Sequence, residues 1–214
     1  MSVQSVVIGT LGSPGVARVD QRGTLSVGVS GIDLGWMIGT PQWRDAKREV
    51  GIRQTIATGA PVVTTRLAVG GGDLVQRSYG VAGTPPVACI EFENASREPV
   101  ALALTITATP GARIKKVRGD GATLFVNELE ALAASRPWQQ WTVANDELAL
   151  QSTLDAGATQ SGPITLMKMR GQRSANVALI WPLPHSATLR VALPIAGGRP
   201  RSRCASCARQ PSVG

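Results

Sequence analysis

The chain has 214 residues, enough for one large domain, and 43% of them are hydrophobic, which excludes a wholly disordered protein. Only 17% are charged, and no apolar run approaches the ~20 residues that cross a bilayer as a helix. The net charge is +8, but residues 197–214 carry four arginines and no acid, which leaves residues 1–196 at +4 (18 basic against 14 acidic). We therefore expect a soluble, cytoplasmic protein that does not bind membranes.

Alternating apolar and polar residues recur along the chain at about ten-residue spacing, whereas helical periodicity is nearly absent. The clearest case is 99–108, where four apolar side chains from Val100 to Ile106 share one face. Residues 87–93 alternate likewise, and the polar loop 94–98 predicts that these two strands form a hairpin. The predicted strands are, in chain order, 3–8, 24–30, 62–69, 74–81, 87–93, 99–108, 122–126, 147–152, 164–169, 177–181 and 188–193.

Glycine- and proline-rich segments separate these strands, as a chain of many short strands requires. Two short helices are predicted at 45–50 and 127–135, too few and too short for a βαβ architecture. The pattern predicts an all-β fold, a large antiparallel β-sandwich (supersandwich-like) over residues 1–196. A disordered, flexible, arginine-rich tail is predicted at 197–214.

The familiar catalytic and cofactor motifs are missing. The glycines at 70–72, followed by Asp73, lack the Lys-Ser/Thr of a phosphate loop, so we interpret them as a tight turn. His185 is the only histidine and lies in a proline-stiffened turn, which argues against a Ser-His-Asp triad. Cys204 and Cys207 form a CxxC pair without the other ligands of a zinc site. We expect no cofactor and no metal, and Cys89, within an apolar run, is expected to be a small core residue.

Two groups of residues remain candidates for binding. Glu91 and Glu93 project from the same face of one strand, and carboxylate pairs hydrolyse glycosidic bonds; a solvent-facing or partner-facing charge pair is the alternative. Tryptophan dominates the aromatic residues, with five Trp against one Tyr and two Phe, and it stacks on sugars or anchors interfaces. Trp181 lies in an apolar strand and is expected in the core. For Trp43 and Trp138, in polar loops, the sequence leaves exposed and buried positions equally open.

A set of short segments follows in a fixed order between Leu25 and Leu193. They are Gly35-Trp36-Met37-Ile38-Gly39 with Trp43, Arg53-Gln54, Pro61-Val62-Val63, Gly71-Gly72-Asp73 with Arg77 and Tyr79, Glu91-Phe92-Glu93-Asn94 with Ser96, Pro99-Val100, and Pro182-Leu183-Pro184-His185. Their order and spacing resemble the N-terminal β-sandwich domain of bacterial proteins similar to glucoamylases and glycogen-debranching enzymes.

In that family a large β-supersandwich precedes an (α/α)6 helical barrel, and the catalytic acids lie in the barrel. The resemblance carries no catalytic residue over to this chain, which contains no barrel segment. A truncated or frame-shifted product is a hypothesis that explains both the missing barrel and the arginine-rich end.

The resemblance and the strand pattern lead us to expect a non-catalytic, carbohydrate-related module, which packs on a helical-barrel domain or assists polysaccharide binding. One alternative is a structural or interaction protein, or a fragment without activity of its own; another is a glycoside hydrolase that uses a carboxylate pair. Nucleic acid is not an expected partner, because no aromatic accompanies Lys115, Lys116 and Arg118 in the sequence; only the tail suggests it. The candidate carbohydrate- or partner-binding residues are Trp36, Trp43, Arg53, Asp73, Arg77, Glu91, Glu93, Trp138 and Trp141.

Overall fold

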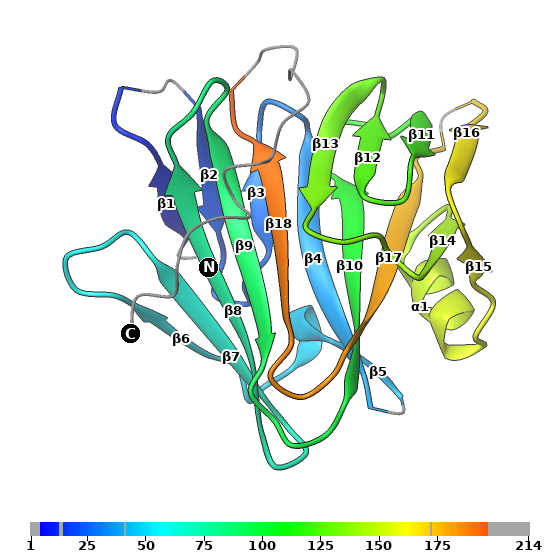
Figure 1. Ribbon diagram of the computed structural model, residues 1–214. Helices are drawn as coiled ribbons and strands as arrows, with labels where there is room; N and C mark the ends of the chain where they lie inside the picture. The colour runs from blue at the N-terminus through cyan, green and yellow to red at the C-terminus, as the bar shows by residue number, and fades with distance from the viewer. Residues whose placement is uncertain (1–4, 13–14, 41, 172, 197–214) are drawn as a thin grey trace.

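Two antiparallel sheets stacked face to face make up the protein (Figure 1). The computed structural model describes residues 5–12, 15–40, 42–171 and 173–196. Sheet A has the strand order β1-β2-β3-β4-β10-β17-β14-β15, with β5 paired to β4, and sheet B has the order β16-β11-β12-β13-β18-β9-β8-β7-β6. This confirms the predicted all-β sandwich. The tail predicted at 197–214 lies outside the described residues.

The strands are short, as the turn-rich sequence predicts. Sheet A consists of β1 (Val6–Gly9), β2 (Val16–Val19), β3 (Leu25–Val27), β4 (Ile32–Gly39), β5 (Trp43–Asp45), β10 (Val100–Ala108), β14 (Gln140–Ala144), β15 (Gln160–Ser161) and β17 (Asn176–Leu183). Sheet B consists of β6 (Arg53–Ile56), β7 (Val63–Val69), β8 (Gly72–Val81), β9 (Val87–Asn94), β11 (Lys116–Gly119), β12 (Thr123–Val126), β13 (Leu129–Ala134), β16 (Ile164–Lys168) and β18 (Thr188–Pro194).

Helical structure is confined to a 3-10 turn, η1 (Ala46–Arg48), and one α-helix, α1 (Glu147–Asp155), in the described part of the chain. The turn η1 confirms a helical segment within the predicted 45–50, although it is shorter. No helix among the described residues is long and apolar enough to cross a membrane.

The core lies between the sheets and is built from the alternating strands. On β10 the predicted apolar face is confirmed, because its side chains from Val100 to Ile106 are buried in the main core. Leu102 lies opposite Ile38 of β4 and Trp181 of β17 in the ladder, and all three are fully buried. The core position expected for Trp181 is thus confirmed.

The loop after β9 connects the two sheets and does not close a hairpin. β9 lies in sheet B between β8 and β18, whereas β10 lies in sheet A between β4 and β17. The predicted hairpin is therefore wrong, because alternation specifies which side chains are buried and not which sheet they join. The tight turn predicted at the glycine run is confirmed: β7 and β8 pair as a hairpin across Gly70 and Gly71, the latter with φ of +73°.

The segment 147–152, predicted as a strand, is the start of helix α1. The carboxylate of Asp146 caps the helix by accepting a hydrogen bond from the Ala149 amide at 2.7 Å. Leu150 and Leu154 lie four residues apart, so both side chains point to the same side and pack on the outer face of sheet A. The alternating leucines are compatible with a strand, but the Asp146 cap stabilises a helix here.

The segment 127–135, predicted as a helix, is strand β13. Asn127 and Glu128 both have positive φ, 50° and 72°, and form the two-residue turn between β12 and β13. This turn commits the following residues to the sheet, where β13 also pairs with β18.

Several strands were not predicted, and β4 is the most central of them. Seven of its eight residues are apolar or glycine, and side chains on both of its faces are buried. Met37 points outward and packs with Leu150 of α1, because the helix covers this part of sheet A. A strand buried on both faces has no period-two signal. The other strands missed are β2, β5, β6, β11, β14 and β15.

Candidate functional site

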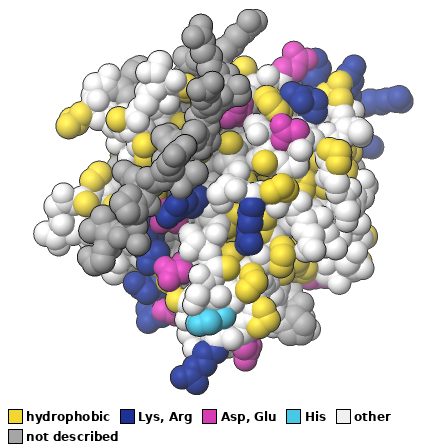
Figure 2. Space-filling model, in the orientation of Figure 1, with side chains coloured by type: hydrophobic (Ala, Val, Ile, Leu, Met, Phe, Trp, Pro, Cys, Tyr) yellow, Lys and Arg dark blue, Asp and Glu magenta, His cyan; other side chains and the backbone are white. Residues whose placement is uncertain are grey.

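Five of the nine candidate residues come together on the outer face of sheet B. We call this surface the charged face; it consists of Arg53, Arg66, Asp73, Arg77, Tyr79, Glu91, Glu93 and Arg190. The side chains share one face because they occupy alternating positions of β6, β7, β8, β9 and β18. On β8 and β9 the intervening residues point into the core. In Figure 2, basic and acidic side chains are interspersed over the left part of this sheet.

The charges of this face are arranged as ion pairs between strands of sheet B. Arg53 of β6 reaches past β7 to β8, whereas the pairs of Glu91 and Glu93 join neighbouring strands. Arg53 bonds to Asp73 and Arg77 to Glu93, each at 2.7 Å. The Glu91 carboxylate accepts hydrogen bonds from Arg190 Nε at 2.7 Å and from the Tyr79 hydroxyl at 3.0 Å.

Both candidate catalytic carboxylates, Glu91 and Glu93, are therefore held by arginines on the outer surface of a sheet. Cross-strand pairs of opposite charge stabilise a sheet by about 0.2–1 kcal/mol each. This geometry favours an ion-paired surface over a hydrolytic pair.

All five tryptophans lie within the described residues, and four of them are buried. Trp36, Trp138, Trp141 and Trp181 are 1%, 4%, 5% and 0% exposed. Trp138 lies against Gly119, where an added Cβ would come within 2.7 Å of the ring, and its Nε1 donates to the carbonyl oxygen of Gly162. An exposed position for Trp138 is thus wrong: its polar flanking residues mark the loop but not the side chain.

Buried indoles offer no face to a ligand in solution. The candidate residues Trp36, Trp138 and Trp141 are all in the main core, and Trp36 meets Phe92 edge to face at a centroid distance of 5.8 Å. We conclude that these three side chains act in packing.

Trp43 is half-buried and lies at the surface of sheet A, on the short strand β5. It is opposite Gly39 of β4, and an added Cβ at Gly39 would lie 3.4 Å from the indole ring. The glycine therefore lets the indole approach the strand, while its remaining apolar contacts are with the small cluster under α1. Trp43 is the one candidate tryptophan that a ligand can reach.

An open depression of about 660 Å³ lies beside this indole. Two segments line it: the start of β5 with the residue before it, and the C-terminal end of α1 with the residues after it. We call it the Trp43 depression; it is lined by Gln42, Trp43, Leu154, Asp155 and Gly157. Its volume falls within the ~300–1,000 Å³ of ordinary small-molecule sites.

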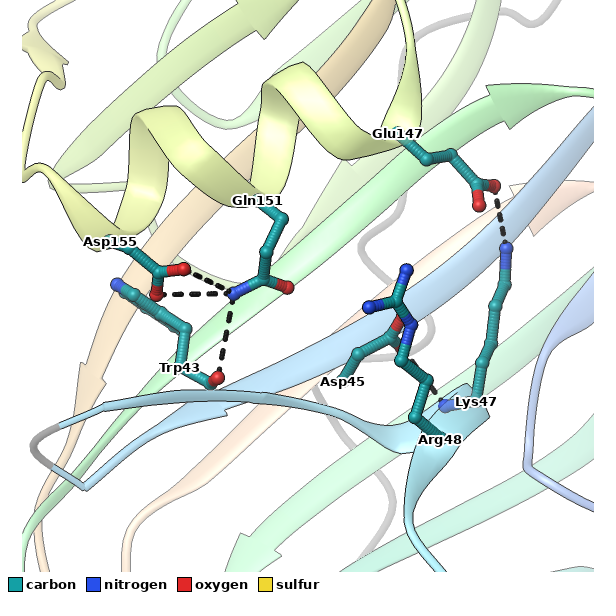
Figure 3. A network of polar contacts seen from close by, with 7 residues as sticks. All are labelled: Trp43, Asp45, Lys47, Arg48, Glu147, Gln151 and Asp155. Atoms are coloured by element: carbon teal, nitrogen blue, oxygen red, sulfur yellow. Dashed lines mark hydrogen bonds and ion pairs between the residues drawn. The ribbon is translucent and has the colours of Figure 1, made fainter.

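Polar contacts hold the two walls of the Trp43 depression together (Figure 3). The Gln151 side-chain amide donates to both carboxylate oxygens of Asp155, at 3.1 and 3.0 Å, and reaches the Trp43 carbonyl oxygen at 3.5 Å. Lys47, just beyond β5, bonds to Glu147 at the start of α1 at 2.8 Å. The segment around Trp43 is thus linked to α1 at the first residue of the helix and at its middle.

A third contact anchors β5 from the other side. Arg44 donates two hydrogen bonds to the Glu49 carboxylate, at 3.1 and 2.6 Å. The guanidinium holds the pKa of that carboxyl below its usual range, although partial burial opposes this shift. Arg44 thus holds the chain next to Trp43 through Glu49, and Gln151 contacts the Trp43 carbonyl oxygen.

Glu130 on β13 provides a pH-dependent test of the sheet B surface. Burial raises the pKa of its carboxyl above 4.5, and the nearby Asp120 carboxylate raises it further. The fold therefore favours the protonated form, and the stability from Glu130 is full below pH 4.5 and is lost as the pH rises through the raised pKa. We expect Glu130→Gln to unfold at a higher urea concentration than the parent at pH 7, and this difference to disappear at about pH 4.

Glu128 is the control for this prediction, because Lys116 lowers the pKa of its carboxyl. Its contribution is present above pH 4.5 and is lost as the pH falls through the lowered value. Glu128→Gln should consequently lose stability at pH 7 and match the parent in acid. Shifts of the same sign for both variants would contradict the assignment.

No protein-family model matches this chain, and no curated protein matches it either. Among the described residues there is no group of three or more His, Cys, Asp and Glu side chains able to hold a metal ion.

The sequence pointed to only part of each surface. On the charged face it missed Arg66 and Arg190, which the period-two pattern of β7 and β18 places on the outer side. Around the Trp43 depression it missed Gln151, which falls in the segment 147–152 predicted as a strand, and Asp155, which lies just beyond that segment. A capping Asp146 followed by leucines four apart is the signal that finds them.

Proposed function

We propose that this chain is a non-catalytic carbohydrate-binding module of β-sandwich architecture, and that its glycan lies against Trp43. The observation that carries this proposal is the half-exposed indole forming one wall of an open depression that the polar residues Gln42 and Asp155 also line. The apolar face of a sugar ring packs on an indole, while carboxylates and amides bind the ring hydroxyls.

The residues around Trp43 supply the complementary groups. The exposed Asp155 carboxylate accepts hydrogen bonds from sugar hydroxyls, and the exposed Gln42 amide both donates and accepts them. Gln151 holds the Asp155 carboxylate in place, which reduces the ordering required when a glycan binds. The resemblance to sandwich domains of glucoamylase-like proteins supports the same class of ligand. It makes α-glucans the first glycans to test.

Titration calorimetry with maltooligosaccharides and soluble glycogen tests this proposal. We expect the parent to bind, Trp43→Ala to bind at least about tenfold more weakly because the stacking surface is lost, and Trp43→Phe to keep most of the affinity. Asp155→Asn should weaken binding by a smaller factor, since an amide still bonds to hydroxyls.

Phe125→Ala is the matched control, because Phe125 is also a half-buried surface aromatic but belongs to sheet B. It should bind glycans as the parent does. Equal losses in Phe125→Ala and Trp43→Ala, or no heat with any glycan of the series, would refute the proposed site.

A further inference from the structure

A cluster of basic side chains lies at the β11–β16 edge of sheet B. We call it the basic corner; its members are Arg113, Lys115, Lys116, Arg118, Lys168, Arg170 and Arg173. Figure 2 shows Lys and Arg side chains gathered at the top right, where Figure 1 places β11 and β16.

The pairing of the flanking loops brings the two halves of this cluster together. Val117 points into the core, so its neighbours Lys116 and Arg118 point outward from β11. Lys168 of β16 lies directly opposite Lys116. Beyond the strands, the Met169 amide donates to the Lys115 carbonyl oxygen at 2.8 Å, which keeps the adjoining loops side by side.

The basic corner accounts for the whole charge surplus of residues 1–196. It has seven cations, and three carboxylates lie in the same segments, 113–130 and 164–173. The rest of residues 1–196 then has eleven cations and eleven carboxylates, so it is neutral overall. Residues 1–196 thus have one surface on which their excess charge is concentrated.

Most of these cations make no ion pair with any described residue. Within the described ranges, the corner's ion pair is the one between Lys116 and Glu128. Lys116 and Lys168 face each other across two strands, an arrangement that destabilises a sheet. Residues that destabilise the fold locally, such as two facing lysines, are expected at surfaces whose side chains serve binding and not folding.

An aromatic side chain lies within the basic corner, although none accompanies it in the sequence. The Arg118 guanidinium sits over the Phe125 ring at 4.0 Å from its centroid. Stacking fixes the guanidinium plane and leaves its N–H groups at the surface, where they can bind phosphate oxygens.

The exposed apolar residues near this edge argue against a membrane as partner. Leu129 and Leu166, about half exposed, lie on β13 and β16 with β11 and β12 between them. Three strand spacings separate them by about 14 Å, so they do not form one apolar patch.

We propose that the basic corner binds the phosphodiester backbone of a nucleic acid.

Fluorescence anisotropy with the full chain and a labelled single-stranded oligonucleotide of roughly 20 nucleotides tests this site. We expect binding that weakens about 50-fold between 50 and 200 mM salt, as four phosphate contacts on a single strand would give. The double variant Lys168→Glu, Arg170→Glu should bind at least about tenfold more weakly and show a shallower salt dependence. It should fold, because a glutamate at 168 faces Lys116 and forms a cross-strand pair of opposite charge.

The matched control is Arg18→Glu, Arg97→Glu, which changes the net charge equally at two exposed positions outside the basic corner. This variant should keep the parent's affinity within about threefold and its salt slope. Equal weakening of both double variants, or a parent that binds anionic vesicles or heparin but no oligonucleotide, would overturn the proposal. Trp43→Ala should leave oligonucleotide binding intact, which separates this site from the proposed glycan site.

Discussion

Replacing Trp36 by alanine is expected to lower the free energy of unfolding by about 3–5 kcal/mol. The side chain is 1% exposed and is among the largest that the core buries completely. Its removal leaves a cavity between the sheets, takes away the edge-to-face contact with Phe92, and frees the Arg22 carbonyl oxygen that accepts a hydrogen bond from Nε1 at 3.2 Å. Urea unfolding followed by circular dichroism measures the change.

Trp43→Ala is the control, since the same atoms are removed from a half-buried position on the outer face of sheet A. We expect a loss of about 1–2 kcal/mol, because only part of the indole leaves an apolar contact. If Trp43→Ala destabilised the protein as much as Trp36→Ala, the division into packing and surface tryptophans would be wrong.

Asn94→Ala is expected to destabilise the protein by about 3–5 kcal/mol. Asn94 is fully buried at the crossover between the sheets. Its amide donates to the carbonyl oxygens of Glu98 and Leu183, both at 2.8 Å, and its own carbonyl accepts from the Ser96 amide and hydroxyl at 3.0 and 2.7 Å. Alanine removes the bond partner of the Ser96 amide and of the Leu183 carbonyl oxygen in the interior, whereas the Ser96 hydroxyl keeps its bond to the Glu98 carbonyl oxygen. A buried polar group left unsatisfied costs about 1–3 kcal/mol.

Asn127→Gly is the matched control for the crossover. The Asn127 side chain also makes three hydrogen bonds, to the amides of Lys115 and Lys116 and to the Arg113 carbonyl oxygen, but it is exposed. Water replaces those partners, and glycine adopts the positive φ of this position without strain. We therefore expect the free energy of unfolding to fall by less than about 1 kcal/mol. Similar losses for both variants, measured by urea unfolding, would show that burial is not what makes Asn94 important.

The fold class was predictable because most strands have one buried and one exposed face. Strand β9 illustrates this: Ala88, Ile90 and Phe92 are fully buried, as alternation predicts. Pairing was less predictable, since β9 and β10 have the same pattern but belong to different sheets. Strand β4 escaped detection because the core covers one of its faces and α1 packs on the other.

The candidate site was predictable in part. Arg77, Glu91 and Glu93 share a face because of their even spacing, which the sequence displays. Tryptophan exposure was not predictable, because Trp43 and Trp138 have similar polar neighbours in the sequence. Only the fold shows that Trp138 is buried in the main core whereas Trp43 lies at the surface of sheet A. The basic corner needed the fold as well, since it joins residues of 113–118 to residues of 168–173 through the pairing of β11 with β16.

Nitrogen–proton correlation spectra of the five indole groups test the proposed glycan site most directly. Trp36, Trp138 and Trp181 donate their indole N–H groups to backbone carbonyl oxygens inside the protein, whereas Trp43 borders the open depression. Addition of a maltooligosaccharide should shift the Trp43 signal, assigned by its loss in Trp43→Phe, and leave the other four in place. An unchanged Trp43 signal, or shifts confined to the buried tryptophans, would contradict the account.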